Sequence, residues 1–190
     1  MEITLSSYAR ELFSCLDSVR ATGPKGELKP DGAMESAART VLKQCSKGRK
    51  VILIGNGGSA SIANHIAVDL WKNGGVRATS FSDSSLLTCI SNDYGYPFSF
   101  EKPVSMFADK GDVLVAISSS GKSENIINGV TAGRAAGCKV ITMSGFGDDN
   151  PLRGMGDINF FVPSGSYGFV EVTHLALCHC ITDIVIARNN

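Results

Sequence analysis

The sequence predicts an α/β fold: a three-layer sandwich in which helices cover both faces of a five-stranded parallel sheet. Short apolar runs that suit buried strands recur along the chain, and segments with helical spacing separate most of them. One such run, Val51–Ile54, ends in a glycine turn that leads directly into a helix, as in a βαβ unit. A length of 190 residues suits one domain with a substantial core, and we expect residues 1–190 to form a single domain.

Two helices are expected before the sheet. Apolar residues at helical spacing occupy residues 5–19, and glycines and prolines at residues 23–30 then interrupt the chain. A second helix is predicted over residues 31–46. We therefore expect an N-terminal helical segment, residues 1–48, followed by an α/β core, residues 49–190. The apolar stripes of the two helices would pack on the sheet or on another subunit.

The first strand, its glycine turn and the following helix span residues 51–71. Gly55, Gly57 and Gly58 allow a sharp turn and leave backbone amides uncovered, and Ser59 suits the N-cap of the helix. Free N–H groups and the positive end of the helix dipole then face one spot, which predicts an anion site.

Four further strands and three further helices complete the predicted sandwich. The strands are expected over residues 77–81, 113–117, 139–143 and 158–162, and the helices over residues 84–91, 124–136 and 169–187. Ligands of such sheets bind outside the carboxyl ends of the strands. A second loop at such an end, Ile117–Glu124, contains three consecutive serines and a glycine, and Ser123 can cap the next helix. Two glycine- and serine-containing loops after two strands of one sheet predict a phosphate site.

Two other interpretations of the glycine turn remain. Gly55-x-Gly57-x-x-Ala60 fits a loose dinucleotide fingerprint, but the acidic residue expected about twenty positions later is missing, since Asp83 lies further on. The turn could also merely pack the helix on the strand. The serine loop is not a P-loop, because Gly-x-x-x-x-Gly-Lys-Ser/Thr is absent. Taken together, the two loops favour phosphate binding over either alternative.

Composition excludes several classes of function. The 18 basic and 18 acidic residues balance, which gives no electrostatic basis for binding nucleic acid or an anionic membrane. No stretch is expected to reach transmembrane length, and no signal peptide is recognisable. The six cysteines are scattered without a Cys-x-x-Cys pair, as in a cytoplasmic protein with reduced thiols. Cys178-His179-Cys180 could bind a metal or simply be part of a helix.

Three motifs resemble the SIS (sugar isomerase) family of phosphosugar-binding domains, and within it the phosphoheptose isomerase branch. They are Ile54-Gly-Asn-Gly-Gly-Ser-Ala60, Ser91-Asn-Asp-Tyr-Gly95 and Ile117-Ser-Ser-Ser-Gly-Lys-Ser123, in that order. The resemblance implies a flavodoxin-like SIS fold and a homotetramer with active sites between subunits. It also implies the conversion of sedoheptulose 7-phosphate to a manno-heptose 7-phosphate.

The resemblance further implies roles for particular residues. The serine loop would hold the phosphate, residues of the glycine turn and Asp93 of the middle motif would line the sugar, and two helices would supply zinc ligands. The phosphate residues are Ser118, Ser119, Ser120 and Ser123, the sugar-lining residues Asn56, Ser59 and Asp93, and the metal ligands His65, Asp69, Glu171 and His179; Gly57 and Glu171 are also expected to bind the substrate or its phosphate. Three positions depart from the family pattern: Asp69 stands where glutamate is usual, Glu171 where glutamine is usual, and Asn73 where an arginine is usual.

Aldose–ketose isomerisation requires a base for the carbon-bound proton and an acid that serves the oxygens. We expect Asp69 and His179 to fill these roles, and the sequence leaves open which residue takes the proton. His65 alone would be an ordinary helix histidine, and His174 is expected to be structural because it lies five residues before His179.

A divalent cation, expected to be one zinc per subunit, would suit the two imidazoles and two carboxylates of the four ligands. Alternatively, Glu171 pairs with a sugar hydroxyl or a neighbouring base. The alternative function is a non-catalytic phosphosugar- or protein-binding regulator of the initiator-associating type. Such relatives lose the acid–base residues, whereas His65, Asp69 and His179 are retained here.

Overall fold

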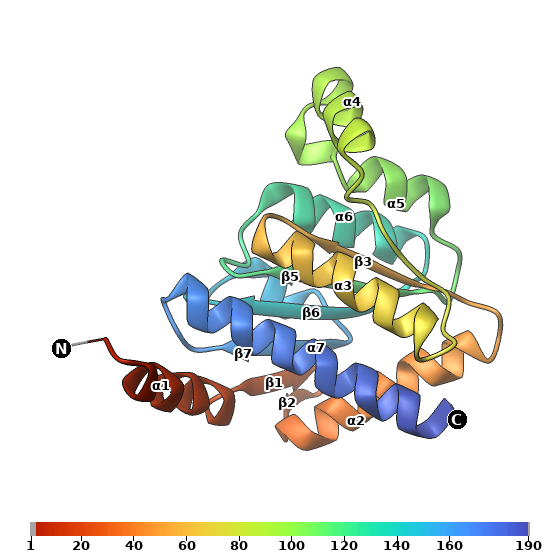
Figure 1. Ribbon diagram of the computed structural model, residues 1–190. Helices are drawn as coiled ribbons and strands as arrows, with labels where there is room; N and C mark the ends of the chain where they lie inside the picture. The colour runs from red at the N-terminus through yellow and green to blue at the C-terminus, as the bar shows by residue number, and fades with distance from the viewer. Residues whose placement is uncertain (1–2, 190) are drawn as a thin grey trace.

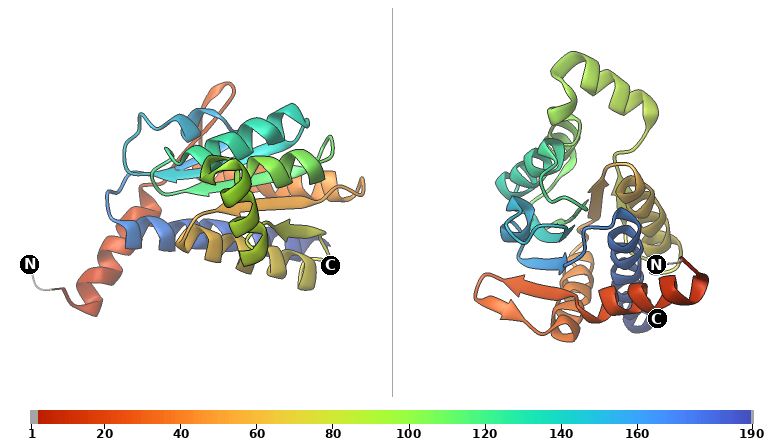
Figure 2. Two further views of the ribbon diagram at one scale, coloured as in Figure 1. Left: turned by 90° about the horizontal axis from the view of Figure 1, so that it is seen from above. Right: turned by 90° about the vertical axis from the view of Figure 1, so that its left-hand side faces the viewer.

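The computed structural model describes residues 3–189, which form one twisted sheet between two layers of helices (Figures 1 and 2). The sheet has the strand order β2-β1-β7-β6-β5-β3-β4. The strands are β1 (Arg20–Gly23), β2 (Gly26–Leu28), β3 (Val51–Gly55), β4 (Ala78–Ser80), β5 (Val113–Ser118), β6 (Lys139–Gly145) and β7 (Ile158–Val162). The helices are α1 (Leu5–Asp17), α2 (Pro30–Cys45), α3 (Gly58–Lys72), α4 (Ser84–Tyr94), α5 (Glu101–Phe107), α6 (Glu124–Ala135) and α7 (Tyr167–Asn189), with short 3₁₀ helices η1 (Tyr96–Phe98) and η2 (Pro151–Gly154).

The central strands are buried on both faces, which explains their continuous apolar sequences. Every residue of β3, β5 and β7 is buried. Alternate residues of β3 point to opposite layers: Leu53 packs in the core formed with α2, α3 and α7, and Ile54 packs in the core formed with α5 and α6. The five strands β3–β7 pair in parallel, so their carboxyl ends lie at one edge of the sheet.

The sheet has seven strands rather than the predicted five, because a hairpin extends it on the β7 side. β1 pairs antiparallel with β7, and β2 pairs antiparallel with β1, which makes the sheet mixed. Gly26, with a φ of 111°, closes the hairpin turn. The glycines and prolines of residues 23–30, predicted only to interrupt the chain between two helices, therefore include this turn. Both N-terminal helices are present, but this hairpin separates them, so residues 1–48 are not wholly helical.

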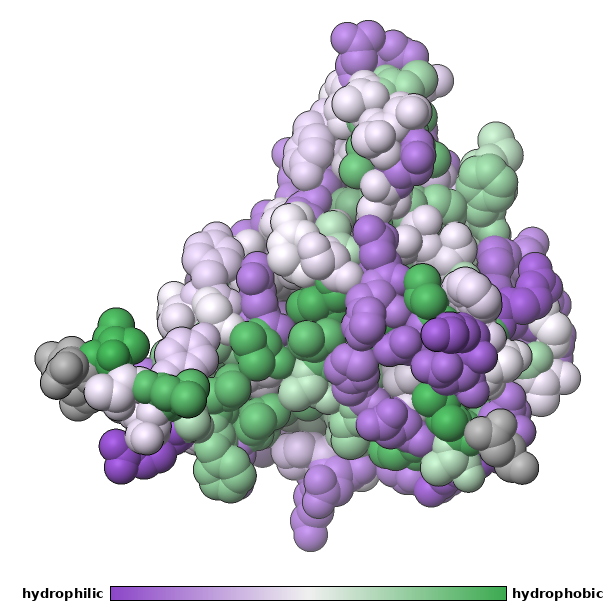
Figure 3. Space-filling model, in the orientation of Figure 1, coloured by the Kyte–Doolittle hydropathy of each residue, from purple (hydrophilic) through white to green (hydrophobic). Residues whose placement is uncertain are grey.

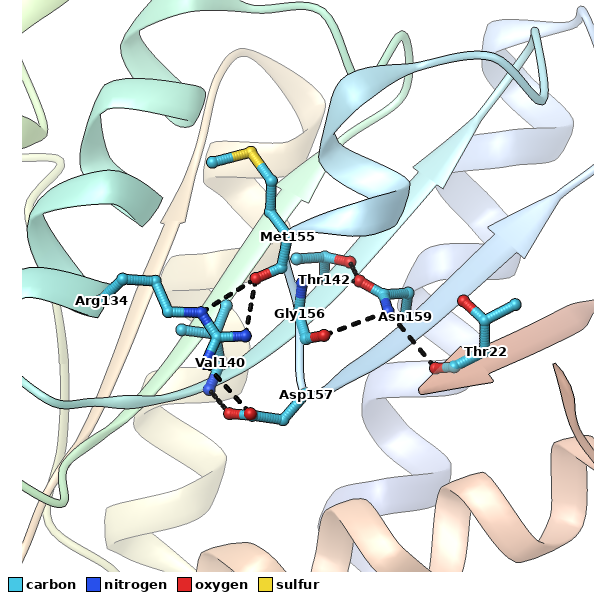
Figure 4. A network of polar contacts seen from close by, with 8 residues as sticks. All are labelled: Thr22, Arg134, Val140, Thr142, Met155, Gly156, Asp157 and Asn159. Carbon is cyan, nitrogen blue, oxygen red and sulfur yellow. Dashed lines mark hydrogen bonds and ion pairs between the residues drawn. The ribbon is translucent and has the colours of Figure 1, made fainter. Parts of the chain in front are cut away.

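A network of polar contacts holds this extension to the sheet and connects the amino ends of β6 and β7 (Figure 4). Asn159 of β7 accepts a hydrogen bond from the Thr142 hydroxyl and donates one to the Thr22 carbonyl of β1, at 2.8 and 3.3 Å. Asp157 accepts from the Val140 amide at 2.8 Å and pairs with Arg134 of α6 at 3.0 Å. These side chains thus hold the hairpin and α6 to the sheet at the end opposite the candidate site.

Most predicted helices match the structure within a few residues, but two departures bear on the site. The sequence did not predict α5, a seven-residue helix that covers β3 and β5 together with α6. α3 begins at Gly58 with Gly57 at the N-cap, so Ser59, predicted as the cap, is buried in the first turn instead.

α1 and α4 lie at the periphery, outside the two helical layers (Figure 1). Neither helix contains a buried residue. α7 departs from the expectation about membranes, since by length and composition it is the one helix among residues 3–189 that could span one. Its residues Val170, Leu177, Ile181 and Val185 instead pack in the core against the sheet. α7 therefore has the properties of the core helix of a globular domain.

Candidate active site

The carboxyl ends of β3 and β5 open into a cleft of about 240 Å³. The two predicted loops form most of its wall, and the first two turns of α7 complete it. The lining residues are Asn56, Gly57, Gly58, Ser59, Ser118, Ser119, Ser120, Ser123, Tyr167 and Glu171. The structure thus brings both glycine- and serine-containing loops to one place, with the N-termini of α3 and α6 facing the same space.

The turn from β3 into α3 depends on its glycines. A Cβ atom on Gly55 would lie 2.5 Å from the Ser59 carbonyl oxygen, so a larger residue would force the loop open. Gly57 has a φ of 52°, a conformation that disfavours other residues. The first turn of α3 has N–H groups without intrahelical partners, and its residues Gly58 and Ser59 line the cleft. The loop therefore offers backbone donors to an anion.

The serine loop offers hydroxyl groups. The Ser118 hydroxyl donates to the Ser123 hydroxyl at 3.3 Å, and the Ser120 hydroxyl accepts from the Lys122 amide at 3.2 Å. Ser119 lines the cleft and is 6% exposed, yet its hydroxyl has no hydrogen-bond partner among the described residues. A buried hydroxyl without a partner costs about 1–3 kcal/mol. An acceptor group of a ligand in the cleft would remove this cost.

A second group of functional side chains also comes from α3 and α7. Asp69 Oδ2 lies 3.3 Å from His65 Nε2 and 3.9 Å from His179 Nδ1. The three potential ligand atoms all lie within 4.8 Å of one another, and the imidazole rings meet edge to face with centroids 5.2 Å apart. A carboxylate between two imidazoles is a donor set that fits a divalent metal ion such as zinc.

Glu171, the expected fourth ligand, is not part of this group. Its carboxylate lies against Gly58, where a Cβ atom would be 2.4 Å from Glu171 Oε2. The absence of a side chain on Gly58 allows this approach, and the positive end of the α3 dipole favours a carboxylate there. The structure thus places Glu171 at the wall of the cleft and leaves three residues at the candidate metal centre.

The sequence was compared with family models and with curated proteins. Residues 16–145 match the family model described as SIS domain. The chain belongs to the SIS domain family. It is 37% identical over 158 residues to the phosphoheptose isomerase of Aliarcobacter butzleri, which covers 80% of this chain and 83% of that protein. It is 34% identical over 163 residues to that of Geobacter sulfurreducens, covering 83% and 86%. These relatives place it among the phosphoheptose isomerases.

A solved structure shares the whole architecture of this SIS domain. The phosphoheptose isomerase of Neisseria gonorrhoeae superimposes with a TM-score of 0.84 at 30% identity, covering 95% of this chain and 97% of that one. The α/β SIS fold predicted from the three motifs is therefore confirmed, with the added hairpin as the correction.

Asp93 and Asn73, two positions singled out by the resemblance, lie away from the cleft of this SIS domain. Asp93 is exposed near the end of α4, where it accepts hydrogen bonds from the Asn92 amide and the Cys89 thiol. Asn73 donates to Asp69 Oδ1 at 3.4 Å, on the side away from the two imidazoles. Within the chain, Asp93 is therefore not among the residues that line the cleft.

The remaining histidine of the SIS domain, His174, and the two cysteines beside His179 lie outside the candidate metal group. His174 is fully buried and its Nε2 lies 3.1 Å from the Ser144 carbonyl oxygen, as expected for a structural residue. Burial raises the pKa of Cys178 to about 12, and Cys180 is exposed on the other side of α7. Neither cysteine beside His179 belongs to the candidate metal group, so of this helical tripeptide only His179 contributes to that group.

Three residues near the cleft were missed by sequence reasoning. Tyr167 lines the cleft directly. Tyr96 and Asn125 hydrogen-bond to Asn56, and both come from segments far from it in sequence. Asn125 follows the serine loop closely, which was the one available signal. No local pattern marks an aromatic residue in a 3₁₀ helix as part of a site.

Proposed function

We propose that this SIS domain is an aldose–ketose isomerase that converts sedoheptulose 7-phosphate to D-glycero-D-manno-heptose 7-phosphate. The observation that carries the proposal is the cleft between two helix N-termini with the buried, unpartnered Ser119 hydroxyl. α3 and α7, which line this cleft, also carry the His65–Asp69–His179 group. The names of the relatives supply the sugar.

The phosphate binds between the two loops in this proposal. Ser118, Ser119, Ser120 and Ser123 supply hydroxyls, and the amides of Gly57, Gly58 and Ser59 supply backbone donors. Charge-assisted hydrogen bonds of this kind are about twice as strong as neutral ones. Asn56 and Glu171 then meet the sugar chain beyond the phosphate.

In the isomerisation a proton leaves the hydroxyl-bearing carbon next to the carbonyl, which gives an enediol, and a proton is then returned to the former carbonyl carbon. Asp69 and His179, whose Oδ2 and Nδ1 atoms are 3.9 Å apart, serve as the base and the acid. A carboxylate can accept the carbon-bound proton, and an imidazole can exchange protons with the oxygens on the two reacting carbons. His65 and His179 flank the same carboxylate oxygen and thereby orient it.

One zinc ion per subunit is proposed at His65, Asp69 and His179, each of which would supply one ligand atom. The second carboxylate oxygen of Asp69 and the second ring nitrogen of His179 would then remain for proton transfer. Bound there, the ion would polarise the sugar oxygens. Glu171 contributes to sugar binding in this version of the site rather than to the metal.

The assembly and location belong to the proposal as well. Leu5 and Phe13 of α1 are exposed, as is Ile3 just before it, and Figure 3 shows apolar side chains gathered over α1 and the adjoining part of α7. An exposed apolar patch of this kind is typical of a subunit interface. We propose that residues 1–190 act as one SIS domain in a cytoplasmic homotetramer, which light scattering can measure.

The acid–base assignment is tested by Asp69→Asn, which keeps the shape and removes the base. We expect turnover of sedoheptulose 7-phosphate to fall by about 10²–10⁴-fold. Asp183→Asn makes the same chemical change at an exposed position of α7 and should leave turnover unchanged. Equal turnover in both variants would contradict the role of Asp69. A pure protein without turnover that co-purifies with a protein partner would instead favour the non-catalytic regulator.

A further inference from the structure

Asn56 lines the cleft, and residues of η1 and α6 hydrogen-bond to its side chain. Its Oδ1 accepts hydrogen bonds from the Tyr96 hydroxyl at 2.8 Å and from Asn125 Nδ2 at 2.9 Å. Its Nδ2 donates to Asn125 Oδ1 at 2.9 Å. Two acceptor positions and one donor hydrogen of the amide are thereby used. One N–H hydrogen of Asn56 stays available to a ligand.

Asn125 anchors this arrangement in the protein interior. It lies in the first turn of α6, is 2% exposed, and donates a further hydrogen bond to the buried Ser99 hydroxyl at 3.1 Å. Asn128, one turn further along α6, donates to the Pro97 carbonyl at 3.1 Å. The segment 96–99 is therefore fixed to α6. Through the reciprocal Asn56–Asn125 amide pair, the loop before α3 is fixed to the start of α6.

Tyr96 differs from Asn125 because it contributes little to the core. It is 55% exposed, and α4, which precedes it, has no buried residue. Among the described residues its hydroxyl makes one hydrogen bond, the one to Asn56. The hydroxyl therefore acts on the orientation of the Asn56 amide rather than on the stability of the fold.

We propose that Tyr96 is a positioning residue of the phosphate cleft. Its hydroxyl and Asn125 lock the Asn56 amide so that the loop before α3 and the loop before α6 keep the spacing that one phosphate group requires. The inference rests on the proposed sugar phosphate site. It adds that Tyr96, on a segment outside the cleft, controls affinity through Asn56.

The test compares Tyr96→Phe with Tyr94→Phe, using inorganic phosphate and sedoheptulose 7-phosphate as probes. Tyr94 lies two residues away, is 54% exposed, and its hydroxyl makes no hydrogen bond with the described residues. Loss of one hydrogen bond should raise the dissociation constant of Tyr96→Phe about three- to tenfold. Tyr94→Phe should bind like the wild type, and both variants should keep the wild-type melting temperature.

A double-mutant cycle shows whether Tyr96 acts through Asn56. In an Asn56→Ala background, Tyr96→Phe should change phosphate affinity by less than twofold, because the partner of its hydroxyl is already gone. An equal effect of Tyr96→Phe in both backgrounds would mean that Tyr96 acts by another route, and the proposal would be wrong.

Hydrogen exchange of the unliganded protein provides a readout that needs no ligand. The Ala60 and Ser61 amides bond to carbonyls of Asn56 and Gly57. Their exchange should accelerate in Tyr96→Phe and stay unchanged in Tyr94→Phe. Unchanged exchange together with unchanged affinity of Tyr96→Phe overturns the inference and leaves the phosphate site intact. Failure of the wild type to bind either probe would contradict the proposed function itself. The hydrogen-exchange comparison of Tyr96→Phe and Tyr94→Phe would still test whether the Tyr96 hydroxyl orients Asn56.

Discussion

Ser119 carries a buried hydroxyl that finds no protein partner at the wall of the cleft. If a phosphate oxygen is its partner, Ser119→Ala removes a charge-assisted hydrogen bond worth about 1.5–3 kcal/mol. The Michaelis constant for sedoheptulose 7-phosphate should rise about 10- to 100-fold. The free energy of unfolding should not fall, because the hydroxyl makes no hydrogen bond in the unliganded protein.

Ser144→Ala is the matched control for this prediction. Ser144 also has a buried hydroxyl without a partner, but it does not line the cleft. Steady-state kinetics of the two variants should therefore differ. A Michaelis constant that stays at the wild-type value in Ser119→Ala would place the phosphate elsewhere.

His174 predicts a pH dependence of stability. Burial lowers its pKa from 6.5 to about 4, so the folded protein binds this proton less readily than the unfolded chain does. The stability that the neutral imidazole provides is present above pH 6.5 and is lost as the pH falls from 6.5 to about 4. Over that range the wild type should lose up to about 3 kcal/mol more than His174→Gln. Urea denaturation of both proteins at several pH values measures this difference, and parallel curves would contradict it.

At the scale of elements, α3 and α7 form the functional unit, because each contributes to the cleft and to the His65–Asp69–His179 group. A metal ion bound there would link the two helices. Zinc at about 100 times its dissociation constant should add about 2.7 kcal/mol to the free energy of unfolding and raise the melting temperature. Elemental analysis of protein purified without a histidine tag or chelator should find about one metal ion per chain.

His65→Ala should abolish the zinc-dependent rise without affecting the metal-free protein, since the His65 side chain is 55% exposed. Lys72→Ala, at the last residue of α3, should keep the full rise. Metal well below one ion per chain, with no effect of zinc on the melting temperature, would rule out the metal centre.

The elements that sequence predicted are those with a local signal. The β-branched run of β3 and its glycines defined the first strand and loop, and the serines after β5 marked the second. The hairpin of β1 and β2 had no such signal, because its strands are short and mostly exposed, and because β1 joins the sheet by pairing with β7, more than 130 residues away. The position of Glu171 was equally unpredictable. It depends on the approach of α7 to Gly58, a contact between distant elements.

At the scale of the whole molecule, the sheet brings together residues that the sequence separates. The glycine turn and serine loop, about 60 residues apart, meet because β3 and β5 are neighbouring parallel strands. Asp69 and His179, 110 positions apart, meet because α3 and α7 cover the same face. The apolar side chains over α1 stay exposed within one chain, which is the basis for the proposed tetramer.

Sugar phosphate isomerisation can be followed by NMR of the pure protein with a panel of ketose phosphates. Sedoheptulose 7-phosphate should yield the manno-heptose 7-phosphate, seen as new anomeric proton signals of an aldose. Asp69→Asn should yield it about 10²–10⁴-fold more slowly. If the wild type forms no aldose from any ketose phosphate in the panel, while it still binds phosphate in the cleft, the protein is a binding module and not an isomerase.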